Sequence, residues 1–267
     1  MNQPLAYVHP QARIAKNAVI EPFVNIERNV EVGEGTWIGS NVTIMEGVKI
    51  GKNCKIFPGA VIGAIPQDLK YAGEDTIVEI GDNVIIREFV TINRGTSESW
   101  KTVIGDNCLL MAYVHIAHDC FIGKNVILGN VCNLAGHIHI DDYAILGGLC
   151  AIHQFVKIGG HVYIGGGSLV RKDVPPFTKA AREPLSYAGI NSVGLRRRGY
   201  TNEKINEIQD IYRILYVKKG YNVTKAVNYI SANMPSTPER DEILTFIAKS
   251  TRGIMKGYTS LSGNGSI

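Results

Sequence analysis

A branched aliphatic residue recurs at every sixth position along most of this chain, and this period constrains the fold more than any other feature. Counted from Val8, the register holds Ile, Leu or Val in 25 of the 28 slots up to Val170. The exceptions are Asp68, Glu74 and Glu98. An α-helix has a period of 3.6 residues and would not produce this spacing over such a length. A six-residue unit cannot bury its apolar side alone, so the units must stack into one continuous core.

The other positions of the hexad predict a short strand followed by a turn. The second position is often Gly, and the fourth is often Asn, Gly or Asp, residues that tolerate left-handed backbone angles at corners. The fifth is small or β-branched, so positions five and one alternate around an outward residue, as in a strand with one buried face. Cysteines also occupy this inward fifth slot, which predicts buried, reduced thiols: Cys54, Cys108, Cys120, Cys132 and Cys150.

This pattern resembles that of the hexapeptide-repeat proteins, whose chain coils as a left-handed parallel β-helix with three hexads in each 18-residue turn. The left hand comes from the resemblance alone, because the general rule for parallel crossovers favours the right hand. We therefore expect a mainly β fold with this β-helix over residues 1–175. Polar loops interrupt the hexads near 64–78 and 95–103, and long loops on a rigid solenoid often carry function.

The hexads stop after Pro175-Pro176, and residues 176–267 are predicted to form a C-terminal helical domain. Apolar residues at helical spacing predict one helix over 203–219, and a second fits 224–233. A third helix is predicted to begin at Thr237-Pro238, which supplies an N-cap and a proline in the first turn, and to continue towards Arg252.

Charge is unevenly distributed between these two regions. Residues 176–267 carry 14 Lys and Arg against 7 Asp and Glu, a net charge of +7, whereas residues 1–175 carry 14 against 17, a net charge of −3. A basic surface suits an acidic protein partner, a phosphate or a nucleic acid, and it can also be merely solvated. The run Arg196-Arg197-Arg198 has no interleaved aromatic residues, so we expect no nucleic-acid binding.

The composition is that of a globular chain, with 45% hydrophobic and 19% charged residues. The longest uncharged stretch, residues 125–140, has 16 residues and includes His137 and His139, and Tyr143–Val156 has 14 and includes His153, so both are too short and too polar to span a membrane. The N-terminal residues do not resemble a secretory signal. We therefore expect a cytoplasmic protein without a membrane span.

Five of the seven histidines lie within residues 115–153. On an 18-residue coil, His118, Gly136 and Gln154 lie above one another and span about 10 Å along one edge, at the usual strand spacing. A histidine beside glycine N–H groups is suited to acyl transfer, since the ring can accept a hydroxyl proton and an N–H can stabilise an oxyanion. This histidine-rich edge argues against a purely structural solenoid.

A zinc site is the main alternative, because histidines on neighbouring coils can bind zinc, as in the β-helical carbonic anhydrases. No Cys-x-x-Cys or His-Glu-x-x-His pattern supports it. We therefore expect no metal site.

Several longer motifs are similar to those of the UDP-N-acetylglucosamine O-acyltransferases, the first enzymes of lipid A biosynthesis. They are QDLKYAGE at 67–74, HIAHDC at 115–120, LAGH at 134–137, HQF at 153–155, GLRRRG at 194–199 and STRG at 250–253. The resemblance covers nearly the whole chain. It implies transfer of a long (R)-3-hydroxyacyl group from acyl-carrier protein to the 3-hydroxyl of UDP-N-acetylglucosamine.

The resemblance also implies roles for individual residues. His118 matches the general base, Gly136 the N–H donor to the oxyanion, and Asp119 follows the base, where it either orients His118 or caps a turn. Gly166 matches a position where side-chain bulk limits acyl length. The residues implied to bind the nucleotide sugar or position the substrates are Gln67, Asp68, Lys70, His115, His137, His153, Gln154, Asn191, Arg197 and Arg198.

The partners and cofactors follow from the same resemblance. The family forms homotrimers with active sites between subunits, and its acyl donor is carried on the phosphopantetheine arm of an acidic carrier protein. No further cofactor is implied. An N-acyltransferase of the same pathway is the closest rival, but it usually carries an additional N-terminal uridine-binding domain, whereas the hexads here begin at Val8.

Two positions depart from the family pattern. Asn93 stands where better-known relatives have histidine, and Val193 stands where they have a glutamate that contacts the nucleotide sugar. These differences leave open whether the acceptor sugar carries a 3-hydroxyl or a 3-amino group.

Overall fold

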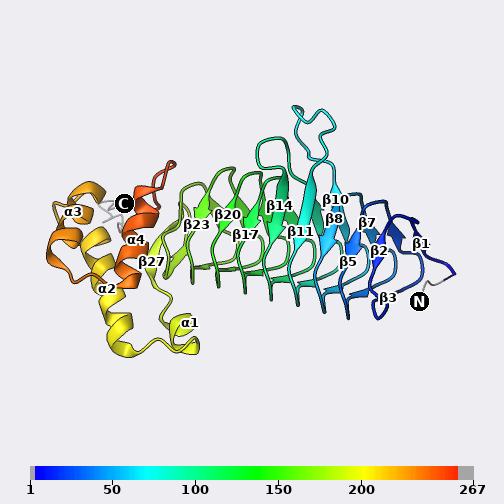
Figure 1. Cartoon of the computed structure of the whole chain (residues 1–267). Helices are drawn as coiled ribbons and strands as arrows, with labels where there is room; N and C mark the ends of the chain where they lie inside the picture. The colour runs from blue at the N-terminus through cyan, green and yellow to red at the C-terminus, as the bar shows by residue number, and fades with distance from the viewer. Residues whose placement is uncertain (1–3, 258–267) are drawn as a thin grey trace, which may run out of the picture.

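The computed structural model describes residues 4–257, and its hexads form a three-sided prism of stacked coils (Figure 1). Sheet A contains β1 (Tyr7–Val8), β4 (Asn25–Ile26), β7 (Thr43–Ile44), β10 (Val61–Ala64), β13 (Thr91–Asn93), β16 (His115–Ile116), β19 (Asn133–Leu134), β22 (Ala151–Ile152) and β25 (Leu169–Val170). Sheet B contains β2 (Arg13–Ile14), β5 (Glu31–Val32), β8 (Val48–Ile50), β11 (Ile77–Ile80), β14 (Lys101–Ile104), β17 (Phe121–Ile122), β20 (His139–Ile140) and β23 (Lys157–Ile158).

Sheet C contains β3 (Val19–Ile20), β6 (Trp37–Ile38), β9 (Lys55–Ile56), β12 (Ile85–Ile86), β15 (Leu109–Leu110), β18 (Ile127–Leu128), β21 (Ile145–Leu146) and β24 (Tyr163–Ile164), followed by β26 (Thr178–Ala181), β27 (Ser186–Ile190) and β28 (Lys256–Gly257). Every third strand of the coils therefore pairs, in parallel, within one sheet. This is the expected left-handed parallel β-helix.

Three edges join these sheets, and each is a column of turns 18 residues apart. The first edge connects sheet A to sheet B and includes residues 118–119, 136–137 and 154–155. The second edge connects sheet B to sheet C at 124–125, 142–143 and 160–161, and the third connects sheet C to sheet A at 130–131, 148–149 and 166–167.

The register predicted from the hexads is confirmed by burial and backbone angles. The repeated aliphatic residues fill the prism, and the five cysteines are buried among them as free thiols. Asn29, Asn41 and Asn53 have positive φ at the turns, as predicted. Farther along, bulkier residues adopt the same left-handed angle, among them Val131 and Leu149. Stacking of the coils therefore imposes a conformation that costs roughly 1–2 kcal/mol per residue in isolation.

Two loops project from the prism beside the first edge. One runs from Ala64, where β10 ends, to Ile77, where β11 begins, and the other connects β13 to β14 (Figure 1). Their bases are joined, because the Thr76 hydroxyl donates a 2.6 Å hydrogen bond to the Gly95 carbonyl.

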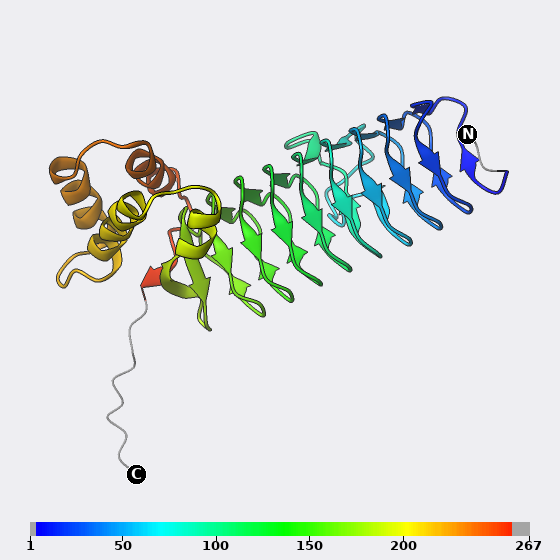
Figure 2. The ribbon, with the colours of Figure 1, turned by 90° about the horizontal axis from the view of Figure 1, so that it is seen from below.

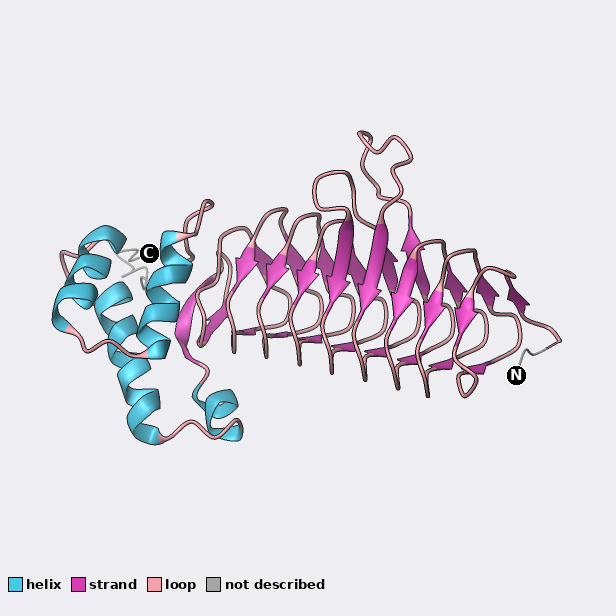
Figure 3. Cartoon of the chain, in the orientation of Figure 1, coloured by secondary structure: helices cyan, strands magenta, loops and turns pink. Residues whose placement is uncertain are grey.

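Helices cover the C-terminal end of the prism (Figures 2 and 3). They are α1 (Ser192–Arg197), α2 (Asn202–Tyr216), α3 (Val223–Asn233) and α4 (Pro238–Ala248). The three predicted helices correspond to α2, α3 and α4, whereas α1 was not predicted. Tyr212 of α2 is fully buried and donates a 2.6 Å hydrogen bond to the Pro176 carbonyl, which fixes the helices to the last coil. None of the helices in residues 4–257 is long and apolar enough to cross a membrane.

Candidate active site

His118 lies on the first edge, directly after strand β16. Only 4% of the surface of His118 is exposed to solvent, and its Nδ1 is 2.7 Å from Oδ2 of Asp119. When Nδ1 carries the ring proton and donates a hydrogen bond to this carboxylate, Nε2 is unprotonated and can accept a proton. The pair therefore has the arrangement of a general base oriented by an acid.

Asp119 is held by the loop between β13 and β14. Its Oδ1 accepts hydrogen bonds from the Thr96 N–H at 2.9 Å and the Ser99 N–H at 3.3 Å, and its Oδ2 accepts one from the Thr96 hydroxyl at 2.7 Å. Burial alone would raise the pKa of the Asp119 carboxyl, but hydrogen bonds from His118 and Thr96 outweigh it and lower that pKa. The carboxylate is therefore ionised and fixed at neutral pH.

Gly136 stacks against the His118 ring one coil farther along. A Cβ built on Gly136 would lie 2.6 Å from Cε1 and 2.8 Å from Nε2 of His118. Only glycine fits beside the ring here. The Gly136 carbonyl accepts the Phe155 N–H at 3.2 Å, while no acceptor in the described residues binds the Gly136 N–H. A free N–H of a residue that packs against the His118 ring can stabilise negative charge that develops on a substrate oxygen.

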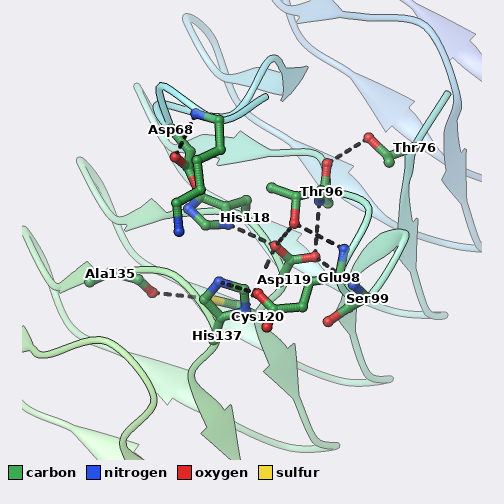
Figure 4. A network of polar contacts seen from close by, with 12 residues as sticks. Asp68, Thr76, Thr96, Glu98, Ser99, His118, Asp119, Cys120, Ala135 and His137 are labelled. Carbon is green, nitrogen blue, oxygen red and sulfur yellow. Dashed lines mark hydrogen bonds and ion pairs between the residues drawn. The ribbon is translucent and has the colours of Figure 1, made fainter. Parts of the chain in front are cut away.

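Two further histidines border this centre. The rings of His137 and His118 meet edge to face at 5.0 Å, and Nε2 of His137 is 3.4 Å from Oε2 of Glu98 (Figure 4). His115 is half-buried on β16, with Nδ1 2.8 Å from the Thr91 hydroxyl. Burial lowers the pKa of His115, so its ring is neutral at physiological pH and can donate and accept hydrogen bonds.

The loop at 65–76 carries the predicted residues Gln67, Asp68 and Lys70. Oδ1 of Asp68 accepts the Lys70 N–H at 2.9 Å, and Figure 4 draws Asp68 together with the network around His118. Asn93 supports the base of this loop, because its Nδ2 donates to the Ile65 carbonyl at 3.1 Å. Oδ1 of Asn93 is buried and has no hydrogen-bond partner among residues 4–257.

The first edge continues with His153 and Gln154, both exposed. His139, by contrast, lies on sheet B, where its Nε2 is 2.9 Å from Oδ1 of Asp141. Three of the five clustered histidines, His118, His137 and His153, thus lie at the first edge, and His115 lies next to it on β16 of sheet A. The fifth occupies an outward position of a strand, because residue 139 falls two positions after the turn.

The remaining predicted residues lie elsewhere on the chain. Asn191 caps α1 and donates from Nδ2 to the His161 carbonyl on the second edge at 2.9 Å. Arg198 donates to the Tyr143 carbonyl on the same edge at 3.1 Å, and Arg197 is exposed beside it. Gly166 lies on the third edge. One chain therefore does not bring these residues together with His118.

Sequence reasoning missed three residues of the loop between β13 and β14. Thr96 and Ser99 bind Asp119, and Glu98 approaches His137. The loss of the hexad at Glu98 marked this loop as unusual, but nothing in the sequence indicated which of its residues would reach the first edge.

Three side chains in this cluster are also potential metal ligands. Donor atoms of His118, Asp119 and His137 all lie within 4.8 Å of one another. Both oxygens of Asp119 already accept hydrogen bonds, and Nδ1 of His118 points at this carboxylate instead of away from it. A metal ion here would have to displace these contacts, so the arrangement favours proton transfer over metal binding.

Comparison with known proteins gives consistent results along the chain. The family profile described as Udp N-acetylglucosamine O-acyltransferase, Domain 2, matches residues 173–255, and the bacterial transferase hexapeptide profile matches 101–136. The acyl-[acyl-carrier-protein]–UDP-N-acetylglucosamine O-acyltransferase of Chlorobaculum tepidum is 52% identical over 202 residues, 74% of this chain and 76% of its own length. That of Alkalilimnicola ehrlichii is 42% identical over 196 residues, 73% of this chain and 76% of its own length.

Solved structures extend the similarity over both regions. A UDP-N-acetylglucosamine acyltransferase from Bacteroides fragilis superposes with a TM-score of 0.94 at 51% identity, covering 96% of this chain and 100% of its own. The enzyme from Francisella novicida gives a TM-score of 0.92 at 42% identity, covering 96% and 94%. The coil and the helical end thus share one arrangement with these proteins.

Proposed function

This chain belongs to the family of acyl-[acyl-carrier-protein]–UDP-N-acetylglucosamine O-acyltransferases, and we propose that its first edge is the site of the transfer. The enzyme moves an acyl group from acyl-carrier protein to UDP-N-acetylglucosamine, the first step of lipid A biosynthesis. The observation that carries the site assignment is the His118 ring, which lies between the Asp119 carboxylate and the backbone of Gly136.

His118 acts as the general base in this mechanism. Its Nε2 takes the proton from the 3-hydroxyl of the sugar as that oxygen attacks the thioester carbon. The ring then carries a positive charge, which the ionised Asp119 stabilises through Nδ1. When the tetrahedral intermediate collapses, the C–S bond breaks and the proton passes from Nε2 to the departing sulfur. A positioned base of this kind contributes ~10²–10⁴ in rate.

Gly136 supplies the oxyanion donor. Negative charge appears on the former thioester carbonyl when the C–O bond forms, and the Gly136 N–H stabilises that charge. A single donor of this type typically accounts for ~2.7–4 kcal/mol of the barrier. The fit of this residue against Nε2 of His118 supports the assignment, because base and donor must act on neighbouring atoms.

The nucleotide sugar is bound by residues from two chains. Asp68, Lys70, His115, His137, His153 and Gln154 belong to the first edge or its loop. Asn191 and Arg198 flank α1 and are hydrogen-bonded to the second edge, and Arg197 lies between them on α1. Gly166, which is implied to limit the acyl group, lies on the third edge. Residues on separate edges of a rigid prism can share one ligand only if a neighbouring chain brings them together. We therefore propose a homotrimer with active sites between subunits.

The acyl donor is a long (R)-3-hydroxyacyl group on the phosphopantetheine arm of the carrier protein, and the reaction needs no metal and no further cofactor. A cytoplasmic location follows from these substrates. Neutral His115 and the occupied Asp119 carboxylate support chemistry based on hydrogen bonds and proton transfer.

The test is a transfer assay on metal-stripped protein with UDP-N-acetylglucosamine and 3-hydroxyacyl-carrier proteins of several chain lengths. We expect turnover without metal and one preferred chain length. His118→Ala should abolish turnover and leave the oligomer intact. His139→Ala changes a histidine on sheet B and should leave turnover unchanged. A His118→Ala variant that retains more than a tenth of the wild-type rate would exclude this base.

A further inference from the structure

Arg94 is a buried arginine at the first edge, and the mechanism described above does not use it. Only 8% of its surface is exposed, and no carboxylate among residues 4–257 lies within ion-pair distance of it. Its Nε donates a 2.9 Å hydrogen bond to the Gly63 carbonyl, and its backbone N–H donates at 2.9 Å to the Ala64 carbonyl. A full positive charge is therefore buried against neutral backbone oxygens.

The register of sheet A places Arg94 in the same column as the proposed base. Ile92 pairs with Ile116, so two residues farther along both strands Arg94 lies one coil before His118, at about 4.8 Å along the stack. The bond from Nε to Gly63 shows that the side chain reaches back to the coil before that. Arg94 thus connects the coil next to the base with the preceding coil.

Gly63, the acceptor of this bond, is a bulged residue of β10. The pairing of β10 with β13 shifts between Ile62 and Ala64, so Gly63 has no partner in that ladder. Its φ is +86°, an angle that glycine adopts without strain. A bulge bends its strand and leaves a residue unpaired, and here Arg94 binds the carbonyl of that residue. The loop at 65–76 starts two residues after Gly63, so Arg94 fixes the point from which the loop departs.

The run of residues 93–96 binds both ends of this loop and also the acid beside the base (Figure 4). Nδ2 of Asn93 donates to a carbonyl at the start of the loop at 3.1 Å, and the Gly95 carbonyl accepts the Thr76 hydroxyl at its end at 2.6 Å. The last residue of the run binds Asp119 through its N–H and its hydroxyl. A short, continuous segment therefore sets the position of the loop relative to the base.

The surroundings of Arg94 do not favour stability. Burial of a charge without an opposite charge opposes folding, and a neutral donor could bind the same carbonyl. Departures of this kind from the rules that maximise stability are expected at functional positions. The guanidinium is planar and its donors have fixed directions, so it orients the Gly63 carbonyl more closely than a flexible ammonium group would.

We propose that Arg94 is a positioning residue for the acyl transfer, an inference that rests on the proposed function. It holds the start of the loop at 65–76 against the coil next to His118. The sugar that Asp68 and Lys70 bind then presents its 3-hydroxyl to Nε2 of the base. Arg94 acts through the loop and touches no substrate itself.

Arg94→Met tests this role, because methionine fills much of the same space without a charge or an N–H donor. We expect KM for UDP-N-acetylglucosamine to rise about tenfold or more and kcat to fall, since the hydroxyl no longer meets the base in one fixed geometry. KM for acyl-carrier protein should be unchanged. The free energy of unfolding should change little, because removal of the unpaired charge offsets loss of the bond to Gly63.

Arg28→Met is the matched control. Arg28 occupies the same position of an earlier coil on the first edge, is exposed, and binds Glu46 at 2.7 Å through its own Nε. The two variants therefore make the same chemical change in the same column of turns. Arg28→Met should have the wild-type kinetics with both substrates.

A rescue experiment asks whether the guanidinium itself is needed. Arg94→Ala leaves a space at the base of the loop, and methylguanidinium is the probe added to fill it. We expect the probe to lower the raised KM for UDP-N-acetylglucosamine saturably, at concentrations that do not affect the wild type. Methylammonium at the same concentration controls for ionic strength and should have no effect.

Four results would overturn the positioning role. They are a wild-type KM for the nucleotide sugar in Arg94→Met, an equal rise in both KM values, a loss of activity that parallels a loss of unfolding free energy, and the absence of rescue by methylguanidinium. The third result would make Arg94 a residue of the fold alone. Failure of the proposed function is distinct, because the wild-type enzyme would then not transfer the acyl group at all.

Discussion

Oδ2 of Asp119 lies 2.7 Å from Nδ1 of His118, and the same oxygen accepts the Thr96 hydroxyl at 2.7 Å. The carboxylate therefore links a loop that interrupts the coil to the ring that we propose as the base. Such a link fixes both the tautomer and the orientation of the ring. The loop between β13 and β14 thus has a role in the site although none of its residues is proposed to contact the substrate.

Asp119→Asn tests this link. The amide can orient the ring only by presenting its oxygen to Nδ1, and it cannot stabilise the positive charge that develops there. We expect kcat to fall by about 10²–10⁴ with little change in KM. Asp141→Asn removes the acid of the exposed His139–Asp141 pair and serves as the matched control. Equal kcat values for Asp119→Asn and the wild type would show that Asp119 only caps its turn.

The same variant should change the pH dependence of stability. The pKa of Asp119 is lowered in the folded protein, so its ionised form stabilises the fold above the ordinary aspartate pKa of about 3.9. This contribution is lost as the pH falls through the lowered pKa. The difference in unfolding free energy between wild type and Asp119→Asn should therefore be constant above about pH 5 and shrink towards lower pH. Chemical denaturation at several pH values measures it, and a difference that grows on acidification would contradict the assignment.

Gly136→Ala should inactivate the enzyme although it adds one methyl group. The new Cβ would lie 2.6 Å from Cε1 of His118, so the ring must move away from the oxyanion donor. Gly160→Ala is a suitable control, because its Cβ would meet the Asp142 carbonyl and Glu242 at 3.4 Å, an ordinary contact at the corresponding turn of the second edge. We expect at least a hundredfold loss of kcat for the first variant and wild-type turnover for the second. Comparable activity in the two would disprove the crowding argument.

Asn93→Ala should weaken binding of the nucleotide sugar. The substitution removes the hydrogen bond to the Ile65 carbonyl and so loosens the loop that carries Asp68. A hydrogen bond of this type contributes about 0.5–1.5 kcal/mol, so KM for UDP-N-acetylglucosamine should rise about two- to tenfold. The KM for acyl-carrier protein provides the internal control. If both KM values rise together, the loop does not act on the sugar alone.

Mixed oligomers test whether active sites lie between chains. His118→Ala lacks the base, and Arg197→Glu reverses an exposed charge on α1 that we place near the diphosphate. If one chain supplies the base and its neighbour the arginine, some sites in co-refolded mixtures contain both intact residues. The activity of the mixture should then be higher than the residual activity that its Arg197→Glu chains show on their own. Simple averaging of the two parents would contradict a shared site.

Gly166→Met tests the proposed limit on acyl length. Gly166 is exposed on the third edge, and a Cβ built on it would lie 3.0 Å from the Gly148 carbonyl oxygen. We expect the preference to shift to shorter acyl chains while KM for UDP-N-acetylglucosamine stays constant. Competition between acyl-carrier proteins of different lengths measures the shift, and an unchanged profile would place the limit elsewhere.

Much of the fold could be predicted from the sequence because every coil repeats the same physical requirement. An inward aliphatic residue every sixth position fixes the register, and the register alone places His118 beside Gly136. The left hand could not be predicted in this way. It depends on the resemblance, since the general preference of parallel crossovers is the opposite one.

The loops and helices were harder to predict because no repeat governs them. The Asp119–Thr96 contact joins residues 23 positions apart through an irregular loop, and no periodicity encodes its path. The six-residue helix α1 is too short to give a clear amphipathic pattern. His139 lies away from the first edge for a different reason, since closeness in sequence does not give closeness around a prism.

The two ends of the prism also differ in how they are closed. At the C-terminal end the helices bury Tyr212 and Phe177 completely, whereas at the N-terminal end Val8 and Ile14 are only partly buried. In a solenoid each coil interacts only with its neighbours, so cooperativity is local and the weakly covered coils fray first. Fraying from the N-terminus would have to pass many intact coils before it reached His118. The proposed reaction centre is therefore separated from the less buried N-terminal coils by distance along the stack.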